Sequence, residues 1–162
     1  MRREALVGIM SVVLLAICSF LVGCKSEKKN TLEGVWERVE ARFTTAGKTE
    51  SPTRKAIKIF TKNYWVILEQ EPNRPTISAE ATDSERLNAA KTFEAFAGTY
   101  TLKGDTLTEF IDFAPPPRSI GISIPFQIRW EGDRWIQTGK FPKGAGFADD
   151  DAESYEVWKR IE

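Results

Sequence analysis

The sequence predicts an all-β fold, an eight-stranded up-and-down antiparallel barrel with a short helical insertion. Apolar and polar residues alternate in short runs over most of the chain after residue 31, and turn residues separate these runs. Only one stretch breaks this pattern. The chain has 162 residues, of which 41% are hydrophobic and 11% aromatic, enough for one core. Eight strands in meander order usually close into a barrel, because closure removes free sheet edges.

The first residues predict export. A charged start precedes an apolar run over 5–23, the layout of a secretory signal. The run ends at Leu21-Val22-Gly23-Cys24, which resembles the bacterial lipobox, in which the Cys is acylated and becomes the new N-terminus. The resemblance implies a signal peptide over 1–23, a lipidated Cys24 with a flexible tether over 24–31, and a barrel domain over 32–162.

A lipid on Cys24 would hold the protein to a membrane of the bacterial cell envelope. Lys25 follows the cysteine where inner-membrane lipoproteins of enterobacteria often have Asp, so the outer membrane is the expected location. A plain transmembrane anchor is the alternative, since about 20 apolar residues span a bilayer. Cys18 lies inside the signal, so the mature chain would have no disulfide and no thiol nucleophile.

The strands follow from the alternating runs and the turns between them. Gly104-Asp105 and Gly132-Asp133 each suit a two-residue type II′ turn, with Gly at the first central position. Such turns fix the register, so cross-strand partners follow by counting. The predicted pairs are Tyr100 with Glu109, Leu102 with Leu107, Phe126 with Gly139, Ile128 with Gln137, and Trp130 with Trp135. The predicted strands are 35–44, 56–61, 64–70, 98–103, 106–113, 122–131, 134–140 and 154–161.

The stretch 71–97 interrupts the strands. Two prolines end a strand there, and good helix formers follow over 85–91 with Asp83 or Ser84 as N-cap. The sequence predicts a short helix at one rim of the barrel.

Composition restricts the function. Lys and Arg number 23, as do Asp and Glu, and a zero net charge argues against a nucleic-acid partner. The chain has no His, which excludes His-based catalysis and metal sites. Glu109 and Asp112 are expected on opposite strand faces, and nothing pairs a nucleophile with a base. We therefore predict no catalytic residue, no metal and no cofactor, and a monomer.

Several motifs resemble a known family. Gly34-Val35-Trp36 is similar to the Gly-x-Trp motif of lipocalins and fatty-acid-binding proteins, the calycin group. Taken in order, this motif and four further segments resemble the bacterial lipocalin-like lipoproteins, common in Bacteroidetes and largely of unknown function. The resemblance implies that Trp36 plugs one end of the barrel, that Arg160 packs over it, and that Trp158 belongs to the same base. The further matching segments are 58–62, 98–106, 131–135 and 156–160.

The barrel interior is predicted from strand alternation. Inward-facing Ile122, Ile124, Phe126, Ile128 and Trp130, with their partners, would form an apolar wall suited to a small amphipathic molecule.

If Trp36 points inward, so do Arg38, Glu40 and Arg42. These charges either pair among themselves and fill the barrel, or leave an arginine free to hold a ligand carboxylate. A bulge after Trp36 would instead expose all three charges.

The predicted function is that of a lipid-anchored envelope protein whose barrel binds a small, partly apolar and possibly carboxylated molecule without catalysis. The alternative is a filled barrel that acts as a scaffold or binds a protein partner. The candidate ligand-binding residues are Arg38, Arg42, Tyr100, Glu109, Phe126, Ile128, Trp130, Trp135 and Gln137.

Replacing Cys24 by Ala is expected to release the protein from the membrane fraction and to abolish acylation, because the thiol is the predicted attachment point of the lipid. Fractionation of cells grown with labelled fatty acid measures both effects. Labelling that persists in the variant would contradict the lipobox interpretation.

Overall fold

The computed structural model describes residues 31–143 and 150–162. The predicted signal, Cys24 and nearly all of the predicted tether lie outside the described residues. Within the described ranges, no helix has both the length and the apolar character needed to cross a membrane. The segment from Thr31 to Glu162 is one compact unit that contains every strand given below.

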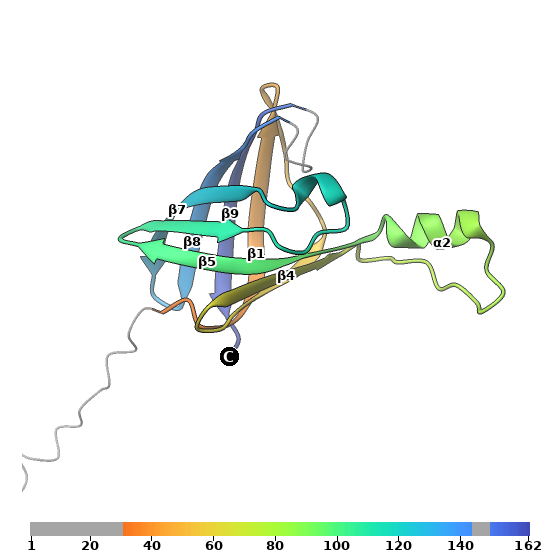
Figure 1. Cartoon of the computed structure of the whole chain (residues 1–162), viewed down its shortest axis with the longest axis horizontal. Coiled ribbons are helices and arrows are strands. Elements are labelled where there is room, and N and C mark those ends of the chain that lie inside the picture. The colour runs from red at the N-terminus through yellow and green to blue at the C-terminus, as the bar shows by residue number, and fades with distance from the viewer. Residues whose placement is uncertain (1–30, 144–149) are drawn as a thin grey trace, which may run out of the picture. The chain divides into compact units, whose positions relative to one another are not determined.

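Eight long antiparallel strands close into a barrel, as predicted, because the last strand pairs with the first (Figure 1). A ninth strand that the sequence did not predict, β2, pairs with the end of β1 and extends a hairpin beyond the ring. The strands are β1 (Gly34–Thr45), β2 (Lys48–Glu50), β3 (Lys55–Phe60), β4 (Tyr64–Gln70), β5 (Phe93–Lys103), β6 (Thr106–Phe110), β7 (Ser123–Glu131), β8 (Arg134–Phe141) and β9 (Ala152–Arg160).

The predicted hairpin register is confirmed in all five pairs, from Tyr100 with Glu109 to Trp130 with Trp135. Gly104 and Gly132 have positive φ angles of 58° and 64°, whereas the aspartates that follow them do not. That combination is the type II′ pattern. Glycine at these two positions therefore determines which side chains of β5 to β8 share a face.

The predicted helix is present as α2 (Asp83–Ala90), but its N-cap is Thr82 rather than Asp83 or Ser84. The Thr82 hydroxyl accepts from the Glu85 N–H, and the Glu85 carboxylate accepts from the Thr82 N–H at 2.7 Å. This reciprocal capping box satisfies two donors at once, which a cap one residue later would not do. The helix projects to one side of the barrel, beyond β4 and β5 (Figure 1).

Strand β5 begins at Phe93, five residues earlier than predicted. Its first residues pair with β4, Phe93 opposite Gln70 and Phe96 opposite Ile67. The Ala and Glu residues in this stretch have high helix propensity, but pairing with a neighbouring strand overrides that preference.

Because of a bulge in β1, fewer charged side chains point into the barrel than strand alternation from Trp36 predicts. The register against β9 shifts between Arg38 and Glu40, which leaves Val39 as the extra residue. The bulge follows Arg38 rather than Trp36, so Trp36 and Arg38 both point inward and only the residues beyond the bulge exchange faces. Glu40 and Arg42 point outward with half-exposed side chains, and the Arg42 guanidinium lies 4.1 Å from the Tyr155 ring centroid.

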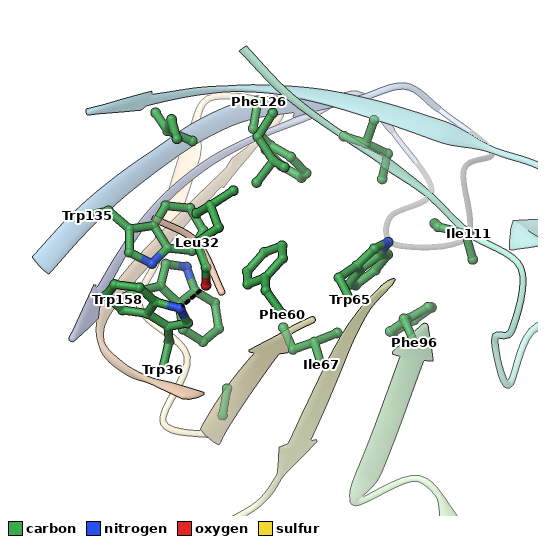
Figure 2. Close-up of a cluster of buried hydrophobic side chains, with 14 of the residues drawn as sticks. Leu32, Trp36, Phe60, Trp65, Ile67, Phe96, Ile111, Phe126, Trp135 and Trp158 are labelled. Atoms are coloured by element: carbon green, nitrogen blue, oxygen red, sulfur yellow. Dashed lines mark hydrogen bonds between the residues drawn. The ribbon is translucent and has the colours of Figure 1, made fainter. Parts of the chain in front are cut away.

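One end of the barrel is filled by aromatic side chains. The buried Trp36 ring lies 5.9 Å from that of Trp130 and 6.0 Å from that of Trp135, and its indole N–H donates to the Leu32 carbonyl at 2.7 Å (Figure 2). Trp158 is fully buried and stacks on Trp135. We refer to this region as the closed end.

Arg160 covers the closed end from outside. Its guanidinium carbon lies 4.1 Å from the Trp36 ring centroid, a favourable cation–π distance. The same guanidinium donates to the carbonyls of Glu33 and Glu162, at 2.8 and 3.1 Å. It therefore joins both termini of the described domain to the indole.

Replacing Trp36 or Trp158 by Ala in residues 31–162 is expected to lower the free energy of unfolding by about 3–5 kcal/mol, because each removes a fully buried indole. Chemical denaturation measures the loss. Phe113→Ala is the control, since Phe113 is 69% exposed and its truncation should cost no more than about 0.5 kcal/mol. A Trp36→Ala protein as stable as the parent would contradict the role of this indole at the closed end.

Candidate functional site

The opposite end of the barrel is hollow. A cavity of about 420 Å³ opens there, between the strand ends and the segment that joins β2 to β3. Trp65, Phe96 and Phe126 point into the interior from three strands, on the side away from the closed end (Figure 2). The remaining apolar lining consists of Phe43, Pro52, Ile67, Ile124, Phe141 and Ala152.

Arg38, just before the β1 bulge, does not itself line the cavity, but it binds two carboxylates that do. Its guanidinium binds the Glu69 carboxylate, with Nη1 at 2.7 Å from Oε1, and reaches Glu156 Oε1 at 3.2 Å. Its Nη2 donates to the Arg54 carbonyl at 3.1 Å and to the second Glu69 oxygen at 3.3 Å. The Arg38 side chain is 3% exposed. Both terminal nitrogens of this arginine are thus occupied by the protein's own acceptors.

Lys58 contributes to the floor of the cavity from β3, the strand next to β1. Its buried ammonium donates to Glu109 Oε1 at 2.9 Å and to Gln137 Oε1 at 3.1 Å. The Gln137 amide N–H₂ donates in turn to Glu156 Oε2 at 3.2 Å. Glu156 therefore joins Lys58 and Gln137 to Arg38 in one hydrogen-bonded array, which we call the floor cluster: Arg38, Lys58, Glu69, Glu109, Gln137 and Glu156.

The rim of the cavity is held by Arg54. Its Nε donates to Glu71 at 2.7 Å, its Nη1 lies 3.0 Å from a Glu94 oxygen, and its Nη2 donates to the Lys91 carbonyl at 3.2 Å. This side chain connects the start of β3 to the end of β4, the residue after α2 and the start of β5. The helical insertion therefore adjoins the cavity rim.

The floor cluster has two cations and three carboxylates, so it is one negative charge in excess when all are ionised. The pKa of Glu109 is raised, first by burial and also by the nearby Glu156, although Lys58 opposes the increase. Burial also raises the pKa of Glu69 against the opposing effect of Arg38, and Glu156 and Glu94 raise it further. A proton on one of these carboxyls removes the excess charge.

The structure separates the predicted ligand-binding residues. Glu109, Phe126 and Gln137 line the cavity. Arg38 lies in the floor cluster, where its two terminal nitrogens already bind protein acceptors. Arg42 lies outside the barrel beside a shallow outer hollow, because the bulge precedes it.

The other four predicted residues lie toward the closed end. Ile128 and Trp135 are buried there with Trp130 packed against the same core, and none of the three lines the cavity. The Tyr100 hydroxyl donates to the Thr61 carbonyl at 2.8 Å, and its ring packs on Phe60.

Several residues of the site are missing from the predicted ligand-binding set, among them Lys58, Trp65, Glu69 and Glu156. Lys58 stands between Ile57 and Ile59, so the alternation of β3 indicates an outward lysine. In the barrel the two isoleucines are half-buried on the outer face and Lys58 is 1% exposed. The available signal was Ala56 and Phe60, which share the face of Lys58 and are also buried.

No protein-family model matches the sequence, and no curated protein matches it. Among solved structures, the chain is similar to a lipocalin-like protein from Bacteroides uniformis ATCC 8492, with 12% identity and a TM-score of 0.43 over 80% of this chain and 98% of that one. It is also similar to an uncharacterized protein from Bacteroides eggerthii DSM 20697, with 12% identity and a TM-score of 0.43 over 81% and 100% of the two chains.

The raised pKa values of Glu69 and Glu109 predict how stability depends on pH. A carboxyl with a raised pKa binds its proton more tightly in the folded state than in the unfolded state. These two groups should therefore make the free energy of unfolding fall as pH rises from about 5 to about 8.

Urea denaturation across that range measures the slope. Glu109→Gln and Glu69→Gln should each make it less negative, whereas the control Glu131→Gln, at an exposed site by the closed end, should not change it. An unchanged slope in both cavity variants would contradict the raised pKa values.

Proposed function

We propose that this protein binds a small, partly apolar molecule in the open end of its barrel and does not catalyse a reaction on it. The observation that carries the proposal is the cavity itself. Its volume of about 420 Å³ lies within the usual range for small-molecule sites. Aromatic and aliphatic walls above a polar floor would bury an apolar body and orient a polar group.

The alternative of a filled barrel describes only the closed end. There the indoles of Trp36, Trp135 and Trp158 occupy the interior. The floor cluster separates this packed region from the cavity, with members on both sides of the barrel. Filling of one end is thus compatible with binding at the other.

A binding role is also favoured over catalysis by the chemistry of the lining. The polar groups at the floor bond mainly to one another. The sequence has no His, and the described residues contain no group of side chains suited to hold a metal ion. None of these groups forms the nucleophile–base pair that covalent catalysis requires.

The proposal includes a membrane anchor, a lipid on Cys24 that would hold the barrel to the cell envelope, with the outer membrane as the expected location. The sequence around Cys24 supports this part. Thr31 and Leu32 enter the domain at the closed end, where Leu32 is buried beside Trp36.

Nile red, a neutral fluorophore, tests the cavity directly. We expect it to bind residues 31–162, and we expect Ile124→Trp to weaken this binding at least tenfold because the larger ring would fill the cavity. Ile120→Trp is the matched control, since Ile120 is 53% exposed and does not line the cavity. Fluorescence titration gives the affinities, and circular dichroism checks that each variant is folded.

Absence of Nile red binding, or equal binding by the parent and the Ile124→Trp variant, would contradict the proposal. Either result would favour the scaffold alternative.

A further inference from the structure

Building on the proposed function, on which this step rests, we propose that the ligand carries a protonated amine beside its apolar part. The proposed ligand charge is opposite to the one expected from the sequence, which suggested a carboxylate held by an arginine. Three features of the cavity support the reversal: its charge balance, an unused carboxylate oxygen and its aromatic walls.

The charge balance favours a cation. The floor cluster holds the cations Arg38 and Lys58 against three carboxylates, all within one hydrogen-bonded array. The rim also has more negative than positive charge, because a single arginine, Arg54, pairs with the carboxylates of both Glu71 and Glu94. An excess carboxylate among buried side chains lacks a counter-charge, and a ligand ammonium would supply it.

The lining offers an unused acceptor beside Lys58, whose ammonium gives two of its three N–H groups to Glu109 and Gln137. Glu109 lines the cavity and uses Oε1 to bind Lys58. Its other carboxylate oxygen has no hydrogen-bond partner among the described residues. Arg38, by contrast, makes four hydrogen bonds through its two terminal nitrogens. A ligand carboxylate would have to displace Glu69 or Glu156 to reach this arginine, and at Lys58 it would add a fourth negative charge to the cluster. An ammonium could bind Glu109 without breaking a bond.

The aromatic walls suit the same charge. The Lys58 ammonium already lies 5.0 Å from the Trp158 ring centroid and 5.6 Å from those of Trp65 and Phe126. These are cation–π distances, so the interior stabilises an ammonium of the protein's own. Trp65 and Phe126 also line the cavity, so an amine bound at Glu109 would lie near the same rings.

Binding of such a ligand should release a proton. Burial raises the pKa of Glu109 and of Glu69, each of which faces one cation and is also near Glu156. An alkylammonium remains charged to about pH 10, as lysine does. Its arrival would stabilise the ionised carboxylate, so affinity should increase as pH rises from about 5 to about 8.

Three probes with one alkyl body test the inference: octylammonium, 1-octanol and octanoate. Each competes with Nile red for residues 31–162. We expect octylammonium to bind at least tenfold more tightly than 1-octanol at about pH 8, and octanoate more weakly than 1-octanol. Calorimetry toward the lower end of the pH range, in buffers of different ionisation enthalpy, should detect the released proton.

Two variants test the site. Glu109→Gln and Glu69→Gln each remove one negative charge from the floor cluster, so each should reduce the preference for octylammonium over 1-octanol to about threefold or less. Neither should weaken 1-octanol binding by more than about threefold. Glu131→Gln removes the same charge far from the cavity and should leave the preference unchanged. Using both cavity variants keeps the test valid if one of them fails to fold.

The outcomes separate the two proposals. Equal affinities for the three probes, or tighter binding of octanoate, would leave a binding barrel but overturn the amine. A preference for octylammonium that survives both cavity variants would also overturn it. Failure of every probe and of Nile red to bind would overturn the proposed function itself.

Discussion

The hydrogen-bonded floor cluster is the constraint on which the rest of this barrel depends. Its six side chains come from six different strands, β1, β3, β4, β6, β8 and β9, and meet across the interior. Buried charges are costly unless they are paired, so these strands must keep the register that brings the partners together. An apolar core of the same volume could be equally stable. The cluster is therefore better understood as the boundary between a packed end and a hollow end than as a source of stability.

The same cluster sets the chemistry of the hollow end. An interior arginine in a barrel of this shape suggests an anion site, and the sequence alone supports that interpretation. In the structure, Glu69 and Glu156 already hold Arg38, and the charge left over belongs to a carboxylate. The ligand charge that a binding site favours thus depends on the net charge of the whole cluster rather than on the presence of one residue type.

Much of the architecture could be predicted because local rules determine it. Gly104 and Gly132 fix two tight turns, and the turns fix the pairing of four strands. The bulge at Val39 could not be located in the same way. Trp36 has the opposite parity to Val39, Ala41 and Phe43, which allows a bulge between them but does not fix its position. Only the pairing of β1 with β9 shows where the register shifts. Lys58 was missed because Ile57 and Ile59 beside it are apolar, so strand alternation assigns them to the core and the lysine to the outer face.

The short strand β2 has a consequence for the behaviour of the molecule in a crowded compartment. It pairs with β1, its three residues are exposed, and Lys48 and Glu50 form an ion pair at 2.6 Å. An unpaired strand edge is a template on which another chain can add and begin an aggregate, and short, charged edges resist this. The hairpin can therefore extend beside the cavity mouth, to which Glu50 contributes, without inviting another molecule to continue the sheet.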